Sequence, residues 1–132
     1  MIHITIVEDD EDDLDFLREG LLSVKEVEIN NLRDGINLIN ILDQCSETDK
    51  PDLIIMDLLL TLKNGLDTLL ELKRNERHCN IPVIILTSSI LHEQSCLDAG
   101  CARYYLKPNS MKEYRYLAEE IFQYLATENT TQ

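Results

Sequence analysis

Short apolar segments alternate five times with segments of helical periodicity along this chain. The apolar segments have the length of β-strands, and they cover residues 2–7, 26–32, 52–57, 81–86 and 102–106. The helical segments cover residues 12–22, 36–42, 66–72, a short stretch through Leu97 to near Gly100, and 111–125. The first, third and fourth apolar segments are almost continuously apolar, which is typical of parallel strands covered on both faces. We therefore expect an α/β fold, a doubly wound five-stranded parallel sheet flanked by five helices, with β-α repeated five times.

The length and composition of the chain fit one folded domain. Hydrophobic residues make up 44% of the 132 residues and charged residues 28%, so the chain can bury a core and is not disordered. We expect one domain over residues 1–126 and a polar C-terminal tail over residues 127–132. No segment approaches the roughly 18–20 apolar residues of a membrane helix, and the first segment lacks the basic flank of a signal peptide. The expected location is the cytoplasm, without a membrane partner.

The formal net charge of -13 limits the partners of the chain. Such a negative field repels nucleic acid and anionic membrane surfaces, and it favours cations and basic protein surfaces. We therefore expect no direct binding to nucleic acid. The cysteines and histidines show no zinc-type spacing, and we interpret them as structural or surface residues with reduced thiols: Cys45, Cys79, Cys96, Cys101, His3, His78 and His92.

Polar and charged side chains lie where four of the five predicted strands end. They are Glu8, Asp9, Asp57, Thr87 and Lys107. The carboxyl ends of parallel strands meet at the edge of a doubly wound sheet where such folds bind ligands, so we expect these side chains to gather. Clustered carboxylates need a proton or a cation, and oxygen ligands suit Mg²⁺. A lysine and a hydroxyl beside them are typical of phosphoryl transfer, in which a carboxylate can be the nucleophile.

These residues also have structural interpretations. Glu8 and Asp9 can complement the dipole of the helix that follows them, and Lys107 can be a surface charge. We interpret the other acidic residues of this region as helix-capping or solvated charges: Asp10, Asp12 and Asp13. The functional interpretation therefore depends on the positions of the residues together and not on any one of them.

The order of these motifs resembles the receiver domains of two-component response regulators, which are CheY-like proteins. The matching residues are Val7-Glu8-Asp9, Asp57 after an apolar strand, Gly65, Thr87-Ser88 and Lys107-Pro108. The resemblance extends from about residue 2 to residue 125, and it predicts a flavodoxin-like, CheY-like topology. The chain departs from the common pattern at Thr61, where the family often has proline.

The resemblance implies a role for each site residue. Asp57 would accept the phosphoryl group, and Thr87 and Lys107 would contact it. Mg²⁺ would be the cofactor, and its implied ligands are Glu8 (through water), Asp9, Asp57 and the backbone carbonyl of Leu59.

The resemblance also implies a switch formed by Thr87 and Tyr104. Movement of Thr87 toward the phosphoryl group would open space that Tyr104 turns inward to fill. Tyr105 competes for this role, and the strand period places the two tyrosines on opposite faces of the sheet. The bond between Lys107 and Pro108 is often cis in this family.

We therefore expect a stand-alone receiver that accepts a phosphoryl group on Asp57 from a sensor histidine kinase or a phosphotransfer protein. It would not turn over external substrates, although it could remove its own phosphoryl group. A downstream protein would bind the face formed by the helix through Leu97, the strand over residues 102–106 and the last helix. The domain would be a monomer or a phosphorylation-dependent dimer. Leu59 and Ser89 flank the route of the attacking water, and the apolar side chain of Leu59 predicts slow loss of the phosphoryl group.

Three other classes compete with this interpretation. A receiver fold can serve as an interaction module without phosphorylation, although the intact site residues argue against it. A phosphatase of the haloacid dehalogenase type needs a second Asp two residues after the nucleophile, where this chain has Leu59. A flavodoxin-like electron carrier needs a phosphate-binding loop after its first strand, where this chain has Glu8-Asp9-Asp10.

Overall fold

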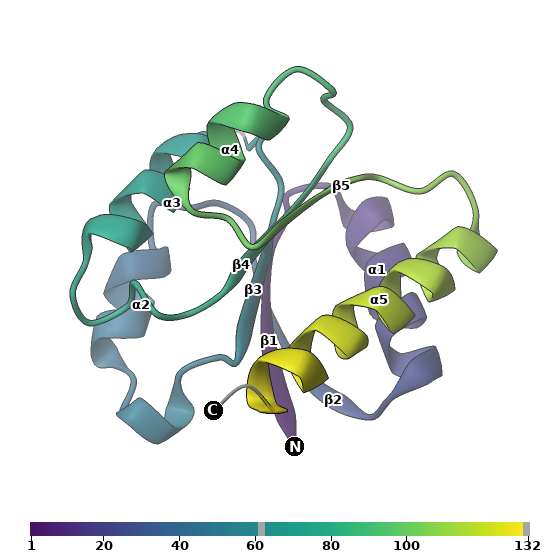
Figure 1. Ribbon diagram of the computed structural model, residues 1–132, viewed down its shortest axis with the longest axis horizontal. Coiled ribbons are helices and arrows are strands. Elements are labelled where there is room, and N and C mark those ends of the chain that lie inside the picture. The colour runs from purple at the N-terminus through teal and green to yellow at the C-terminus, as the bar shows by residue number, and fades with distance from the viewer. Residues whose placement is uncertain (61–62, 131–132) are drawn as a thin grey trace.

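The computed structural model describes residues 1–60 and 63–130, and a parallel sheet of five strands runs through it (Figure 1). The strands are β1 (Ile2–Val7), β2 (Val27–Leu32), β3 (Leu53–Met56), β4 (Val83–Thr87) and β5 (Arg103–Leu106). The helices are α1 (Glu11–Val24), α2 (Leu38–Gln44), α3 (Gly65–Arg74), α4 (Glu93–Ala99) and α5 (Met111–Thr130), with a 3-10 turn at Glu47–Asp49. The strand order is β2-β1-β3-β4-β5, and neighbouring strands are parallel. The predicted doubly wound α/β fold is confirmed.

The helices form two layers around the sheet, with α1 and α5 on one face and α2, α3 and α4 on the other (Figure 1). Strand residues alternate between the two cores, so that Ile4 and Ile6 pack toward α1 and α5 while Val7 packs toward the opposite layer. The helices add the following buried leucines to the cores: Leu17, Leu21, Leu38, Leu42, Leu69, Leu72 and Leu117. Each such side chain contributes about 1.5–3 kcal/mol relative to its exposed state.

Local capping sets where several helices begin and end. The carboxylate of Asp10 accepts the N–H of Asp13 at 2.9 Å and starts α1. The Ser110 hydroxyl accepts the N–H of Glu113 at 3.2 Å and starts α5, as the sequence predicts. The helix α4 ends at Gly100, whose φ of 107° is a left-handed conformation that favours glycine.

Several helix ends lie a few residues from their predicted positions, including the start of α2 and the end of α5. The helix α2 begins at Leu38 and not at residue 36, because the Asp34 carboxylate accepts the N–H of Ile36 at 2.8 Å and holds a turn there. The helix α5 continues to Thr130, so residues 127–130 of the predicted tail are helical. Thr61 lies outside the described residues. In the described part of the chain, no helix combines the length and the apolar character needed to cross a membrane.

The centre of the sheet positions the candidate site. Val7 of β1 and Met56 of β3 are partners in the parallel register. Glu8 and Asp57 follow them directly, so both residues leave the sheet at neighbouring points of the same edge. The chain crosses over in opposite directions from β1 and β3, which makes this edge the topological switch point where doubly wound folds bind ligands.

Candidate functional site

The Lys107 ammonium lies among three carboxylates at this edge. Its Nζ is 2.8 Å from Asp57 Oδ2, 2.9 Å from Glu8 Oε1 and 2.6 Å from Asp13 Oδ2. The backbone N–H of Lys107 donates to the Thr87 carbonyl at 2.9 Å, so β5 ends beside β4 and the lysine side chain reaches back across the sheet edge. The structure thus brings together three of the predicted site residues, which come from strands far apart in the sequence.

Burial and hydrogen bonds fix the two inner carboxylates. Asp57 is 4% exposed and Glu8 is 6% exposed. Asp57 Oδ1 accepts the N–H of Leu59 at 3.2 Å, and Glu8 Oε2 accepts the N–H of Asp10 at 3.2 Å. Each carboxylate therefore has one oxygen on Lys107 and the other on a backbone N–H, and both face a common point.

The electrostatics of this cluster reflect burial and charge together. Burial raises the pKa of Glu8, and the nearby charge of Asp57 raises it further, while the hydrogen bond and the charge of Lys107 act in the opposite direction. Burial alone would lower the pKa of Lys107, but its hydrogen bonds to Asp13, Asp57 and Glu8 outweigh that effect and raise it. The lysine therefore remains charged, and three carboxylates share one ammonium.

The donor chemistry of this edge fits a divalent cation. Among residues 1–60 and 63–130, no three His, Cys, Asp or Glu side chains are arranged as a ready metal-binding group, and Lys107 lies between Glu8 and Asp57 instead. The cluster nevertheless carries excess negative charge in a buried position, and Asp9 follows directly as a half-buried residue. Carboxylate oxygens are the ligands that Mg²⁺ prefers in proteins. A cation can therefore be held here once the ammonium moves aside.

Thr87 and Tyr104 lie on the α4 side of this edge. Thr87 is fully buried, and its hydroxyl accepts the N–H of Ser89 at 3.4 Å. Among the described residues, this hydroxyl forms no hydrogen bond to the side chain of Asp57 or Lys107. Tyr104 packs against the core under α2, α3 and α4, whereas the next tyrosine in β5 packs against the core under α1 and α5. Tyr104 is therefore the tyrosine that faces the loop after Thr87.

Gly65 lets α3 begin directly against the backbone of Asp57. Its N–H donates to the Leu58 carbonyl at 2.9 Å. A Cβ at this position would lie 2.3 Å from the Asp57 carbonyl oxygen and 2.8 Å from Leu58 Cα. Only glycine fits this close approach without a shift of the backbone that carries Asp57.

Two features of the site differ from the sequence analysis. Asp13, which we interpreted as a capping or solvated charge, forms the shortest of the three ion pairs of Lys107. Asp13 is the third residue of α1 and lies in the first turn of the helix that follows β1. This position is the signal that could have indicated the contact. The Lys107–Pro108 bond is trans, since no cis peptide bond occurs in the described residues.

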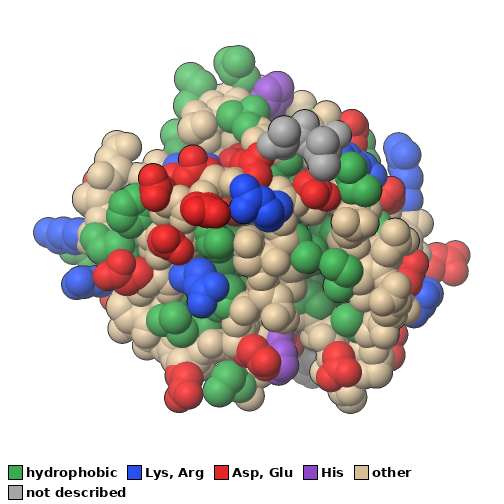
Figure 2. All heavy atoms as spheres, turned by 180° about the vertical axis from the view of Figure 1, so that it is seen from behind, with side chains coloured by type: hydrophobic (Ala, Val, Ile, Leu, Met, Phe, Trp, Pro, Cys, Tyr) green, Lys and Arg blue, Asp and Glu red, His purple; other side chains and the backbone are tan. Residues whose placement is uncertain are grey.

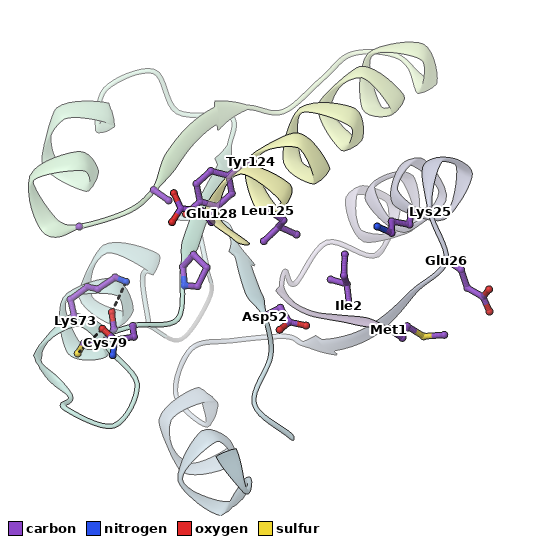
Figure 3. A pocket seen from close by; sticks show the side chains of 14 residues that line it. Met1, Ile2, Lys25, Glu26, Asp52, Lys73, Cys79, Tyr124, Leu125 and Glu128 are labelled. Atoms are coloured by element: carbon purple, nitrogen blue, oxygen red, sulfur yellow. Dashed lines mark hydrogen bonds between the residues drawn. The ribbon is translucent and has the colours of Figure 1, made fainter. Parts of the chain in front are cut away.

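A cavity lies at the opposite end of the sheet from this cluster. It has a volume of about 720 Å³, and its lining includes Ile2, Asp52, Pro82 and Ala102, which lie at or just before the amino ends of four strands (Figure 3). The site is therefore defined by its side chains at the carboxyl edge and not by cavity size.

Acidic side chains are spread over the back face of the molecule, with a smaller number of Lys and Arg among them (Figure 2).

Sequence comparison assigns the chain to one protein class. Residues 4–119 match the family model of the response regulator receiver domain. The chain therefore belongs to the receiver-domain family of response regulators.

Several curated proteins are similar to the chain. It is 38% identical over 90 residues to the response regulator Rcp1 of Synechocystis sp., an alignment that covers 65% of this chain and 61% of Rcp1. It is 33% identical over 115 residues to the transcriptional regulatory protein CpxR of Klebsiella pneumoniae, covering 86% of this chain and 46% of CpxR. It is 30% identical over 113 residues to the polar-differentiation response regulator DivK of Brucella anthropi, covering 84% of this chain and 88% of DivK. The chain thus spans less than two thirds of Rcp1 and less than half of CpxR.

Solved structures share the fold over nearly the whole chain. The phosphorylated cyanobacterial phytochrome response regulator RcpA superposes with a TM-score of 0.83 at 27% identity, covering 96% of this chain and 95% of RcpA. The Mn²⁺-bound form of Rcp1 superposes with a TM-score of 0.79 at 29% identity, covering 92% of this chain and 91% of Rcp1. The receiver domain of the sensor histidine kinase PA1611 of Pseudomonas aeruginosa has magnesium coordinated in its active site cleft. It superposes with a TM-score of 0.73 at 25% identity, covering 90% of this chain and 95% of the PA1611 domain. Divalent cations therefore occur in structurally similar receiver domains.

Proposed function

We propose that this receiver domain accepts a phosphoryl group on Asp57, in a reaction that depends on Mg²⁺. The observation that carries the proposal is the Lys107 ammonium, 2.8 Å from a carboxylate oxygen of Asp57 that is almost completely buried. A fixed positive charge in a buried place can stabilise the charge of a phosphoryl group during transfer. The metal-bound structures of Rcp1 and PA1611 support the choice of a divalent cation.

The phosphoryl donor would be a phosphohistidine on a sensor histidine kinase or a phosphotransfer protein. A carboxylate oxygen of Asp57 forms a bond to phosphorus, the bond between phosphorus and the histidine nitrogen breaks, and the nitrogen keeps the electron pair. Lys107 and the Thr87 hydroxyl would contact the transferred oxygens. The chain is in this proposal a phosphoacceptor and not an enzyme that turns over external substrates.

A divalent cation would offset the negative charge of the phosphoryl oxygens. The groups that would hold it are Glu8, Asp9, Asp57 and the backbone carbonyl of Leu59. Glu8 and Asp57 already face a common point, because a backbone N–H binds one oxygen of each carboxylate, Oε2 of Glu8 and Oδ1 of Asp57. Lys107 would leave these oxygens and remain near the phosphoryl group.

The output surface would be the face formed by α4, β5 and α5. Leu97 of α4, Leu106 of β5 and Tyr116 of α5 are exposed, so each of the three elements offers an apolar side chain to a partner. Tyr104 would turn inward as Thr87 moves toward the phosphoryl group, and this would change the same face. The acidity of the chain favours a partner with a basic surface. The domain would act in the cytoplasm, as a monomer or as a dimer that forms on phosphorylation.

The test is phosphorylation by a small phosphodonor, acetyl phosphate, followed by intact-mass spectrometry. Wild-type protein with Mg²⁺ should gain one phosphoryl group, and the gain should be lost in Asp57→Asn and in the presence of a chelator. Asp52→Asn is the matched control, because Asp52 lies at the other end of β3 and should leave the gain unchanged. An unphosphorylated wild type would instead support an interaction module that works without phosphorylation.

A further inference from the structure

Asp13 gives Lys107 a carboxylate partner from a different element than the other two. Glu8 and Asp57 follow the central strands, whereas Asp13 lies in the first turn of α1. The side chain of Asp13 is 33% exposed, while the side chains of Glu8 and Asp57 are 6% and 4% exposed. The Lys107 ammonium therefore contacts two buried carboxylates at the sheet edge and one partly exposed carboxylate of α1.

The backbone of α1 fixes the position of Asp13. Its N–H donates to the Asp10 carboxylate at 2.9 Å, which makes Asp13 the third residue of the capped helix. A carboxylate in a first helical turn is favourable because of the helix dipole, but Asp12 has the same benefit. Among the described residues, Asp12 does not pair with Lys107, whereas Asp13 does so at 2.6 Å. The helix dipole therefore does not explain why the Asp13 side chain points toward the ammonium.

Lys107 and a divalent cation compete for the same oxygens. The ammonium contacts Glu8 and Asp57, which are two of the proposed cation ligands. Two positive charges cannot approach the same carboxylate oxygens closely without strong repulsion. Cation binding therefore requires Lys107 to loosen its contacts to the inner carboxylates. Asp13 is outside the proposed ligand set, so it can keep the ammonium when the other two carboxylates release it.

We propose that Asp13 is a positioning residue that retains Lys107 at the α1 rim of the site, so that Glu8 and Asp57 are available to a divalent cation. This inference rests on the proposed function, because it assumes the cation site. It extends that function by assigning a role to a carboxylate that neither binds the cation nor accepts the phosphoryl group. The pair keeps the ammonium within reach of Asp57 throughout.

The experiment measures the Kd of Mg²⁺ by isothermal titration calorimetry on unphosphorylated protein. Asp13→Asn is compared with Asp12→Asn, which removes the same charge from the same helical turn without touching Lys107. Asp13→Asn should weaken Mg²⁺ binding about two- to fivefold more than Asp12→Asn, which is the range for a partly exposed ion pair. Asp13→Glu keeps the carboxylate and should bind Mg²⁺ nearly as wild type does. Melting curves without Mg²⁺ check that every variant is folded.

A second comparison is made in a Lys107→Ala background. Without the competing ammonium, Mg²⁺ should bind more tightly, and the difference between Asp13→Asn and Asp12→Asn should disappear. The inference is overturned if the two variants bind Mg²⁺ equally in the presence of Lys107, or if their difference persists without it. A wild type that binds no Mg²⁺ would overturn the proposed cation site itself, and the inference with it.

Discussion

The Tyr104 hydroxyl donates a hydrogen bond to the backbone carbonyl of Ser89, and this bond joins β5 to the loop that follows β4. The same loop follows Thr87, the last residue of β4, whose hydroxyl accepts the N–H of Ser89. Ser89 therefore contacts both residues of the proposed switch through its backbone. A movement of Thr87 toward a phosphoryl group would pull on the residue that holds the tyrosine.

Tyr104→Phe should release the loop after β4. The change removes one hydrogen bond of a half-buried side chain and should lower the free energy of unfolding by about 0.5–1.5 kcal/mol, measured by urea denaturation. Because the ring is no longer held by Ser89, beryllofluoride should induce the switched state at lower concentration. Tyr105→Phe is the control, since Tyr105 packs on the opposite face of the sheet. Equal beryllofluoride titrations for the two variants would argue against Tyr104 as the switch residue.

Leu59→Asn should shorten the lifetime of the phosphorylated domain. Leu59 is 56% exposed beside Asp57, so its apolar side chain can shield the acyl phosphate from water while contributing little to the core. An amide at this position can orient the attacking water, and the dephosphorylation rate should rise about three- to tenfold, equivalent to roughly 0.7–1.4 kcal/mol of barrier. Leu59→Met keeps an apolar shield and should leave the rate near that of wild type. A lifetime in Leu59→Asn that equals or exceeds the wild-type value would contradict the shielding role.

The sequence predicted the fold and the meeting of three candidate site residues, because both depend on periodicity and on strand ends. Glu8, Asp57 and Lys107 could be brought together from the topology of a parallel sheet alone. The partner role of Asp13 could not be predicted, because it depends on the direction of a side chain in the first turn of α1. The start of α2 was placed too early because apolar spacing does not show that the Asp34 carboxylate closes a local turn. Such differences arise from single hydrogen bonds, which leave little trace in a hydrophobic pattern.

Gly65→Ala should disturb the site from the backbone side. The added methyl group would lie 2.3 Å from the Asp57 carbonyl oxygen, so the segment that carries Asp57 has to shift. Strain of this kind costs about 1–3 kcal/mol of unfolding free energy. Phosphorylation by acetyl phosphate should also be slower, because Asp57 moves relative to Lys107. Circular dichroism establishes that the variant is folded, and a folded variant with the wild-type rate of phosphorylation would contradict the close approach.

The thiol of Cys101 should make the free energy of unfolding change with pH in the alkaline range. The pKa of Cys101 is raised from its ordinary value of 9.0 to about 11. Burial is the main cause, and the neighbouring Cys96 contributes to the same increase. Between these pH values the unfolded chain has lost a proton that the folded chain keeps. The free energy of unfolding therefore falls as the pH rises through this window, by about 1.4 kcal/mol per pH unit, whereas below pH 9 the thiol has no such effect.

Cys101→Ala should remove this part of the pH dependence. Urea unfolding under reducing conditions at pH 8, 9, 10 and 10.5 measures it, and the loss of stability from the lowest to the highest pH should be about 1–2 kcal/mol smaller in the variant than in wild type. Comparison at each pH cancels the contributions of tyrosines and lysines, which both proteins share. Cys45→Ala is the control, because Cys45 is only partly buried and lies at the end of α2. If Cys101→Ala and wild type lose stability in parallel over this range, the Cys101 thiol is not held protonated by the core.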